Sequence, residues 1–313
     1  MLKVIGRRLA VAIPMLIVIS TLAFFLVSII PGDPVVALLG PDATAEEYAR
    51  VRAELGLDRP VFVQYFDWMF ALVQGDMGES IRTGRDVAPT IIGRLPVTVS
   101  LAVIAIIATA IIGIALGLVS SLRGGAIGRV AQVGSVVGTS VPNFWLGILL
   151  VLVFAVNLKV LPATGYVPLD KAPGQWAAHL VLPVTAITVA AVAAIARQTR
   201  SAMNDVLGRD FIRTLLATGT PRTSVIYRHA LRNAAIPVVT SLSFQFINLL
   251  SGSIVIEQVF ALPGLGQLLV VAITGRDIPV VQGVVIVTAI LVIIVNLVVD
   301  LVNAWLNPKV RTS

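Results

Sequence analysis

Cysteine is absent from this chain of 313 residues, which excludes disulfide bonds, thiolate metal sites and iron–sulfur clusters. Charged residues are scarce as well, at 12% of the chain, whereas hydrophobic residues make up 57% and the mean hydropathy is +0.96. A soluble domain of this size would need more charged residues to cover its surface. The composition therefore predicts an integral membrane protein.

The short motifs of common catalytic sites are also missing. The chain contains no GxxxxGKS/T phosphate-binding loop, no HExxH pair and no GxSxG element. The segment RGGAIGR, Arg123–Arg129, has glycines but lacks the Lys-Ser/Thr pair, so we interpret it as a tight hairpin. We therefore expect a chain that is not an enzyme, does not bind ATP by this route and holds no cofactor or metal of its own.

The net charge of +7 and the pI near 10.4 raise the alternative of nucleic-acid binding. Basic nucleic-acid binders carry their cations on a polar, solvated fold. Here the Lys and Arg residues lie in short segments between apolar blocks, so we expect no nucleic-acid partner.

Six apolar segments have the length, about 20 residues, that a helix needs to cross a hydrocarbon layer of about 30 Å. They are Leu9–Ile30, Leu95–Leu122, Val130–Asn157, His179–Ala196, Ile236–Ile256 and Val280–Asn303. The first follows three basic residues like a signal peptide, but its apolar run is too long for a cleavable segment and no small-x-small site follows it. We interpret it as a retained anchor. The predicted fold class is an all-α integral membrane protein with six transmembrane helices.

The distribution of Lys and Arg predicts the orientation of the spans. With the N-terminus inside, the inner segments carry basic residues against few acids, chiefly Asp205 and Asp210. These basic residues are Lys3, Arg7, Arg8, Arg123, Arg129, Arg197, Arg200, Arg209, Arg213, Arg222, Arg228, Arg232, Lys309 and Arg311. The arginines of the outer segments are matched by acids, so both termini are predicted to be cytoplasmic, N-in/C-in. His179 and His229 then lie on opposite sides of the membrane and cannot share a metal, and we interpret both as structural.

A polar insertion, Pro31 to Arg94, separates the first two spans and is predicted to be extracytoplasmic. Thr44 and Glu47 have the spacing of a capping box, and Gly56 stands where that helix should stop. The insertion fits a small helical cap packed on the outer membrane face, and a binding site of its own is the alternative.

A second helix of the insertion is predicted to start near Pro60 and to end at Gly75. Its apolar residues form a stripe on one face: Val61, Tyr65, Trp68 and Leu72.

The densest run of arginines, Arg213 to Asn233, lies between the fourth and fifth spans. Four apolar residues just before and within it fall at i, i+1, i+4 and i+5, on one face of a short helix: Phe211, Ile212, Leu215 and Leu216. Gly219 supplies the positive φ that ends this helix, Thr220 is predicted to cap the next one and Pro221 to occupy its first position. The segment is thus predicted to form a helix, a sharp turn and a second helix.

The second helix is predicted to run toward Asn233, with Pro237 at the entry to the fifth span. Ordinary positive-inside anchors that touch anionic lipid would explain the charge. They would not explain a connection of more than 30 residues, Arg200 to Asn233, with its own helix ends. Docking of a cytoplasmic partner is therefore the favoured interpretation.

Several motifs, in order along nearly the whole chain, carry a resemblance to a known family. They are PGDP (Pro31–Pro34), GDMGES (Gly75–Ser80), RLPVTVSL (Arg94–Leu101), SVPNFWLGILL (Ser140–Leu150), LPATGY (Leu161–Tyr166), RTLLATG followed by YRHALRNAAIPVV (Arg213–Val239) and EQVFALPGLGQLLVVAITGRDIPVVQG (Glu257–Gly283). The chain resembles the permeases of the dipeptide/oligopeptide/nickel family of ABC importers, and among them the first of the two permease subunits. The stretch from Gly219 to HAL follows the spacing of their cytoplasmic signature loop, with Arg213, Thr214 and Leu215 at the Glu-Ala-Ala positions.

The resemblance implies that this loop fits a groove on an ATPase subunit. The implied coupling residues are Phe211, Ile212, Arg213, Thr214, Leu215, Leu216, Ala217, Gly219, Thr220, Arg222, Arg228 and His229. The chain departs from the general pattern at Leu215, at Thr218, where relatives often have lysine, and at Arg232, which replaces a proline.

The implied partners are a second homologous permease, two cytoplasmic ABC ATPases that hold ATP and Mg, an extracytoplasmic substrate-binding protein, a peptide substrate and the lipid bilayer. The implied place is the bacterial inner membrane. The expected division is 1–93 for the first span and the insertion, 94–303 for the permease core with the coupling loop at about 201–235, and 304–313 for a cytoplasmic tail.

Polar residues inside the predicted spans are candidates for a transport path, because such groups are costly in a bilayer. They are Ser140, Asn143, Gln245, Asn248, Ser251, Ser253 and Glu257. Hydrogen bonding between helices is the alternative role. Pro142 is expected to kink the third span, whereas Asn296 and Asp300 fit a packing or gate feature.

The function predicted from the sequence is a permease subunit of an ATP-driven importer, with di- or oligopeptide preferred as substrate. Nickel or another small solute carried by the same family is the alternative. An ion-coupled secondary carrier is a further alternative, but it would need carboxylates in the spans or an inverted repeat, and neither is clear.

Overall fold

The structure is a computed structural model that describes residues 2–29, 33–40, 42–123, 134 and 138–306. Every regular element of these residues is a helix, and the described ranges hold no strand beyond an isolated bridge between Glu79 and Asp86. The chain divides into two compact units. The core unit comprises residues 1–5, 98–262 and 294–313, and the insertion unit comprises residues 6–97 and 263–293.

The insertion unit contains most of α1 (Leu2–Ile29), followed by α2 (Pro34–Leu39), α3 (Ala45–Glu54), α4 (Val61–Val73) and α12 (Leu265–Thr274). It also contains the first parts of α5 (Val87–Leu122) and α13 (Ile278–Leu306). Buried Val87 and Ile91 of α5, Leu265 and Leu268 of α12, and Val284 of α13 pack into one cluster. This cluster is the core that joins α12 to the two longer helices.

The predicted capping box at the start of α3 is present. The Thr44 hydroxyl accepts a hydrogen bond from the Glu47 N–H, and the Glu47 carboxylate accepts one from the Thr44 N–H at 2.8 Å. This backbone N–H of Thr44 holds the pKa of Glu47 below its usual value. The helix ends at Glu54, and Gly56 takes a φ of +65°, as the sequence predicted.

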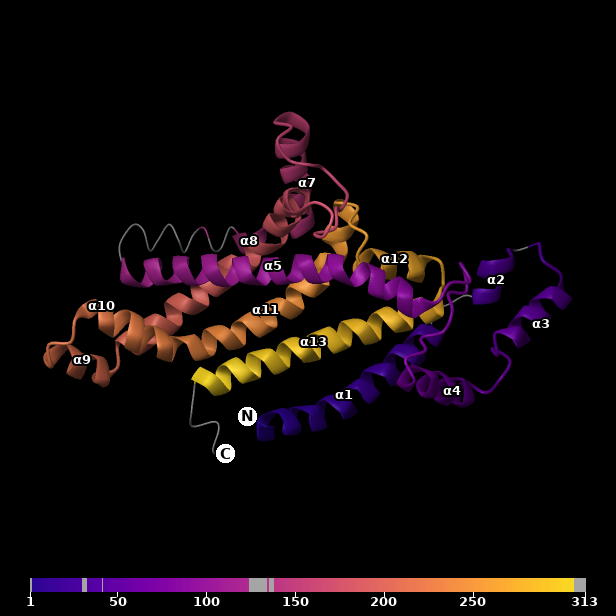
Figure 1. The fold of residues 1–313 in the computed structure, drawn as a ribbon, viewed down its shortest axis with the longest axis horizontal. Coiled ribbons are helices and arrows are strands. Elements are labelled where there is room, and N and C mark those ends of the chain that lie inside the picture. Colours follow the sequence, from indigo (N-terminus) through magenta and orange to yellow (C-terminus); the bar gives the residue numbers. More distant parts are fainter. Residues whose placement is uncertain (1, 30–32, 41, 124–133, 135–137, 307–313) are drawn as a thin grey trace. The chain divides into compact units, whose positions relative to one another are not determined.

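Helix α4 also has the predicted bounds, between Pro60 and a Gly75 with a φ of +87°. The rings of Tyr65 and Trp68 pack on Phe24 of α1, with centroid distances of 5.4 and 5.6 Å. The Tyr65 hydroxyl also lies 2.8 Å from the Thr21 hydroxyl. Figure 1 shows α4 beside the C-terminal part of α1. The insertion is therefore a helical cap on α1, and its place outside the cell stays a prediction.

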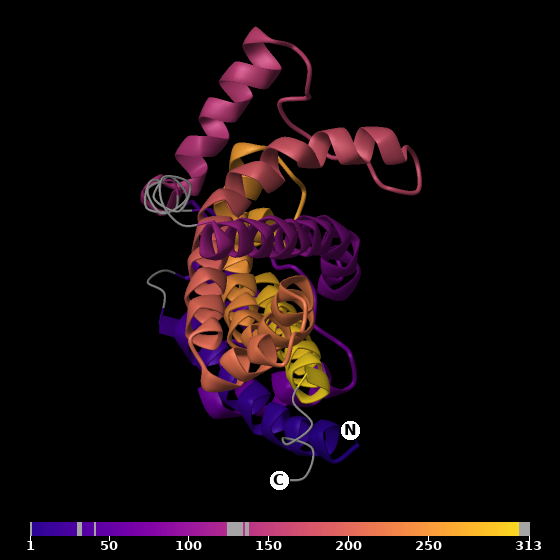
Figure 2. The same cartoon turned by 90° about the vertical axis from the view of Figure 1, so that its left-hand side faces the viewer.

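The core unit contains α7 (Asn143–Leu150), the π-helix η1 (Val151–Asn157), α8 (Pro173–Leu207), α9 (Asp210–Ala217), α10 (Arg222–Ser224), the π-helix η2 (Val225–Ala230) and α11 (Leu231–Val259). In Figure 2 the ribbon of α7 and η1 leads through the irregular segment 158–172 back to the first turn of α8. Helices α5 and α8 approach closely at Gly113 and Gly117. A Cβ at Gly117 would lie 2.5 Å from Cβ of Thr199, so a larger residue would push the helices apart.

Four helices of the described residues are long and apolar enough to cross a membrane: Val87–Leu122, Pro173–Leu207, Arg222–Val259 and Ile278–Trp305. They correspond to the second, fourth, fifth and sixth predicted spans, and all are longer than the sequence predicted. The first predicted span lies within α1, whose apolar stretch is Ala10–Leu26, and the third corresponds to the shorter apolar helix Asn143–Asn157. The count of six spans therefore stays a prediction.

Part of the third predicted span, residues 130–133 and 135–137, lies outside the described residues, as do Pro31 and Gly32 of PGDP, the hairpin expected at Arg123–Arg129 apart from Arg123, and residues 307–313 of the tail. Pro142 is the N-cap of α7, and the residue before it is not helical. The proline therefore interrupts the third segment more strongly than the expected kink, because it cannot donate to the preceding turn.

Candidate functional site

The turn between α9 and α10 has the geometry that the sequence predicted. Gly219 takes a φ of +80°, its N–H donates to the Leu216 carbonyl at 3.1 Å, and the Thr220 N–H donates to the Leu215 carbonyl at 3.1 Å. These two bonds form a Schellman motif, which satisfies the last carbonyls of α9. A helix, a sharp turn and a second helix follow each other in the core unit.

The predicted cap of the second helix is wrong. Pro221 is the N-cap residue, no side chain caps the helix, and Arg222 is its first residue. The reason is the ψ of +135° at Pro221, an extended conformation that delays the start of the helix by one residue. Thr220 therefore lies before the cap and does not bond the first turn.

The second helix does run toward Asn233, but it continues past Pro237 without a break, because α10, η2 and α11 form one helix from Arg222 to Val259. A proline removes one backbone bond, but tertiary packing can offset that loss. Buried Ala234 and Val238, on the two sides of Pro237, belong to the same hydrophobic cluster. This shared burial holds the helix together across the proline.

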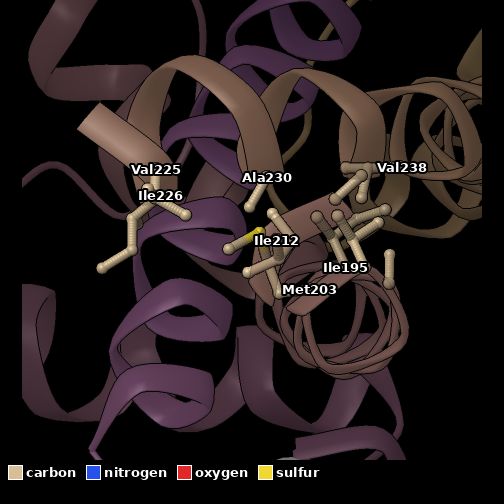
Figure 3. Packing of buried hydrophobic residues seen from close by; sticks show 10 residues of the cluster. Ile195, Met203, Ile212, Val225, Ile226, Ala230 and Val238 are labelled. Atoms are coloured by element: carbon tan, nitrogen blue, oxygen red, sulfur yellow. The ribbon is translucent and has the colours of Figure 1, made fainter. Parts of the chain in front are cut away.

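The base of the turn is a buried apolar cluster. Ile212 of α9 is 3% exposed and packs with Met203 of α8 and with Val225 and Ala230 of η2. Figure 3 shows these side chains pointing toward one another, together with Ile195 and Val238. Leu215 packs against the cluster from its margin. Helix α9 is thereby fixed to both long helices next to it, as Figure 1 shows for α9, α10 and α11.

The outer side of the same turn exposes large apolar side chains and arginines. Phe211, Leu216 and Tyr227 are 38%, 47% and 60% exposed. We call the following exposed set the elbow surface: Phe211, Arg213, Leu216, Arg222, Tyr227 and Arg228. Arg213 has an ion pair with Asp210 at 3.6 Å, but both side chains are largely exposed and such pairs stabilise little.

The remaining predicted coupling residues divide between the two sides of the turn. Thr214, Ala217 and Gly219 are exposed beside the elbow surface, whereas Thr220 and His229 are half-buried. Tyr227 was not among the predicted residues, although an aromatic residue within a polar segment could have drawn attention to it. Its exposure follows from η2, which turns the neighbouring Val225 and Ile226 inward.

Two of the polar residues predicted to line a path are buried in this chain. Glu257 is fully buried, and its carboxylate accepts a hydrogen bond from the Thr98 hydroxyl of α5 at 2.7 Å. Ser253 is 1% exposed and donates to the Leu250 carbonyl at 2.8 Å. The Glu257 contact joins α11 to α5, and the Ser253 contact lies within α11. Hydrogen bonding between helices, as made by Glu257, is the alternative role that the sequence left open.

Other candidates are more accessible. Asn248, Ser140 and Ser251 are exposed, and Gln245 is half-buried. Asn143 is half-buried, and its side-chain nitrogen is 3.5 Å from the place of a Cβ at Gly252, so α7 meets α11 beside Ser251. A shared cavity for Gln245 and Asn248 stays a prediction.

Polar side chains also join α11 to α13. The Ser243 hydroxyl donates to the Asn296 side-chain oxygen at 2.6 Å, and the Asn303 amide donates to the Thr240 hydroxyl at 3.3 Å. Asn296 thus has a packing role, one of the two roles expected for it and for Asp300. His179 Nδ1 lies 2.8 Å from the Gln175 carbonyl of its own helix, and the described residues contain no group of three metal-ligating side chains.

A second buried polar site lies in the insertion unit, and sequence reasoning missed it. The Asp277 carboxylate, at the α12–α13 junction, accepts hydrogen bonds from the Ser80 hydroxyl and from the Ile81 N–H, the latter at 3.1 Å. Asp277 and Ser80 are 5% and 6% exposed. Both lie in motifs that the resemblance rests on, but the contact between them is not local and no spacing predicts it.

Comparisons with known proteins identify related chains. Residues 110–312 match the family model described as binding-protein-dependent transport system inner membrane component, and residues 1–102 match its N-terminal counterpart. A putative peptide transport system permease protein of Brucella abortus is 41% identical over 312 residues, 99% of both chains. A glutathione transport system permease protein of Salmonella typhimurium is 40% identical over 312 residues, again 99% of both chains.

Two solved structures that resemble the chain are ABC transporters. The methionine ABC transporter MetNI in inward-facing conformations matches 69% of this chain and 96% of that chain, with a TM-score of 0.54 at 20% identity. An amino acid ABC transporter with histidines matches 69% of this chain and 93% of that chain, with a TM-score of 0.51 at 16% identity. At these identities the likeness concerns the fold alone.

Proposed function

Because the chain belongs to the family of binding-protein-dependent transport system inner membrane components, we propose that it is the permease subunit of an ATP-driven peptide importer. Peptide is the substrate because relatives at 36–41% identity over nearly the whole chain are named peptide permeases. The chain is not an enzyme, and ATP hydrolysis belongs to separate subunits of such importers. The observation that carries the proposal is the elbow surface on its rigid base.

The elbow surface has the composition of a protein-docking site. It combines three exposed apolar side chains, Phe211, Leu216 and Tyr227, with arginines around them. Aromatic residues and arginine are enriched at the centres of protein interfaces. A lipid anchor would need only the charge, and exposed Phe and Leu next to a buried cluster would be unexplained. We assign this surface to the groove of a cytoplasmic ATPase, which holds ATP and Mg.

The topology belongs to the same proposal. Six spans with both termini cytoplasmic would place the elbow surface inside and the polar insertion, Pro31 to Arg94, outside, as the distribution of basic residues predicts. The four long apolar helices and the two shorter ones support this arrangement. The division into 1–93, 94–303 and 304–313, with the coupling loop at about 201–235, is part of the proposal.

The chain forms half of the translocation path, and a second homologous permease supplies the other half. The accessible candidates Gln245, Asn248 and Ser251 on α11 are the residues that we assign to the path. Ser253 and Glu257 are assigned to packing instead, because both are buried. An extracytoplasmic substrate-binding protein delivers the peptide, and nickel or another small solute is the alternative cargo.

A pair of substitutions on the elbow surface tests the docking. We expect Phe211→Ala together with Leu216→Ala to lose the ATPase subunits during mild detergent purification and to abolish peptide uptake in proteoliposomes. Both side chains are exposed, so the melting temperature should stay that of the unmodified protein. Phe70→Ala is the matched control, because Phe70 is 72% exposed on α4 and belongs to the insertion unit. Retention of the ATPase by the double variant, with full uptake, would show that the docking assignment is wrong.

A further inference from the structure

A cavity of about 780 Å³ lies within the insertion unit and has no role in the function proposed above. Its walls come from the α3–α4 connection, from α1 and α4, and from the α12–α13 junction. Apolar side chains, among them Phe24, Trp68 and Ile273, alternate there with charged ones. The volume falls within the range of about 300–1,000 Å³ that is usual for sites of small organic molecules.

Most charged side chains of the cavity already have a partner. Those in ion pairs are Asp33, Arg52, Glu54, Arg59 and Asp67. The pairs are Arg52 with Asp33, Arg59 with Asp67 at 3.0 Å, and Glu54 with Arg50 outside the cavity. Within the part of the chain that the structure describes, the side chains of Glu79 and Arg276 have neither an ion pair nor a hydrogen bond. The cavity therefore offers one unpaired anion and one unpaired cation.

A buried hydrogen bond holds these two residues at the same wall. Glu79 directly precedes Ser80, and Arg276 directly precedes Asp277, so both adjoin the Ser80–Asp277 bond. The second bond, from the Ile81 N–H to the Asp277 carboxylate, fixes the same contact. Arg276 also has a φ of +55°, in the left-handed region that residues with a Cβ seldom adopt. Such conformations persist where the surrounding structure imposes them, often at binding sites.

We propose that this cavity binds a short zwitterion, namely a peptide of roughly two or three residues with free termini, each residue spanning at most about 3.6 Å. The Arg276 guanidinium binds the α-carboxylate, for which its forked N–H groups are suited, and the Glu79 carboxylate binds the α-ammonium group. The apolar walls receive the peptide side chains. Because both charges are anchored beside one hydrogen bond, short peptides fit better than long ones.

The inference rests on the proposed function, which makes peptide the transported substrate and places the polar insertion, Pro31 to Arg94, outside the cell. The cavity is then a holding site for peptide at the outer ends of the first and sixth predicted spans. A docking surface for the substrate-binding protein is the competing use of the same cavity. The substrate-binding protein would also contact the ion-paired side chains of the cavity. Its binding would therefore not depend on whether the termini of the transported peptide are free.

The test uses the assembled importer in nanodiscs, without the binding protein, titrated calorimetrically with trialanine, its N-acetyl form and its C-terminal amide. We expect Arg276→Gln to weaken trialanine binding about 10- to 100-fold and to remove the preference for the free acid over the amide. Glu79→Gln should remove the preference for the free amine over the acetylated form. Arg276→Lys should restore part of the affinity. Arg85→Gln is the control, because Arg85 is exposed on the same connection and does not line the cavity.

Several outcomes would overturn the inference. One is equal trialanine affinity in the unmodified importer and in both Arg276→Gln and Glu79→Gln, with unchanged melting temperatures. Another is unchanged peptide affinity together with a loss of ATPase stimulation by the binding protein, since this would identify a docking surface. Failure of the proposed function would look different, because the unmodified importer with its binding protein would then import no peptide into proteoliposomes.

Discussion

The elbow of the core unit and the α12–α13 junction of the insertion unit are both sharp connections between helices, but opposite kinds of contact hold them. At the elbow, apolar side chains such as Ile212 and Val225 are buried and the charged ones point outward. At the junction, a carboxylate, Asp277, is itself buried and accepts two hydrogen bonds. Apolar contacts are non-directional, whereas a buried carboxylate depends on each of its partners. The elbow leaves apolar side chains and arginines exposed on its outer side, and the junction uses its polar groups internally.

The largest effect on stability is expected at the base of the elbow. Ile212→Ala removes a buried side chain from the cluster with Met203 and Val225, and substitutions of this kind cost about 2–5 kcal/mol. Limited proteolysis of residues 208–222 should accelerate, and the melting temperature should fall. The control is Leu216→Ala, since Leu216 is 47% exposed on the same helix and should leave both unchanged. Equal effects of the two substitutions would show that the buried base of the elbow and its exposed surface do not differ in their contribution to stability.

A smaller effect is expected at the junction. Asp277→Ala leaves the buried Ser80 hydroxyl and the partly buried Ile81 N–H without this acceptor, which costs about 1–3 kcal/mol. Hydrogen exchange of residues 79–86 should become faster, while exchange in α9 stays the same. Asp277→Asn keeps one acceptor oxygen, so it should lower the free energy of unfolding less than Asp277→Ala does. Asp86→Ala, an exposed acid of the same connection, should change neither. If Asp277→Ala exchanges like the unmodified protein, the buried carboxylate does not hold the connection.

The smallest effect is expected at the turn of the elbow. Gly219→Ala places a Cβ in the left-handed region at a φ of +80°, which costs about 1–2 kcal/mol, although no heavy atom lies within 4 Å of the new Cβ. Gly208→Ala is the matched control, because Gly208 has a φ of −76° and its Cβ would meet only ordinary contacts at 3.6 Å and beyond. The difference between the two melting temperatures then measures the conformational cost alone. No difference would mean that the turn relaxes to another conformation.

Local signals were enough to predict several elements from the sequence. The capping box of Thr44 and Glu47, the bounds of α4 and the positive φ of Gly219 depend on residues within one or two helical turns of each other. Hydropathy predicted the four long apolar helices but underestimated their lengths. The end turns of these helices contain polar residues and are stabilised by packing, as at Met203 and Val206 of α8. A hydropathy scale does not include such packing, so it predicts helices that are too short.

Contacts between distant residues could not be predicted in this way. Ser80 and Asp277 are 197 positions apart, and only the folded insertion unit brings them together. The continuity of the helix through Pro237 likewise depends on burial of Ala234 and Val238 by another helix. Tyr227 lies outward because of the π-helical turn of η2, which has no sequence signature. The helix, turn and helix of the candidate site were predicted from the sequence, whereas which of its side chains are buried or exposed required the structure.

The unbroken helix from Arg222 to Val259 has a mechanical consequence. Its 38 residues make a stiff rod of about 57 Å, with one end at the elbow surface and the other beyond Glu257. A displacement of the elbow would therefore tilt the whole helix and move its far end, without a chain of rearranging side chains in between. Any bending of the helix would concentrate near η2 and Pro237, close to the elbow. The part of the helix beyond Pro237 would then move as one rigid body.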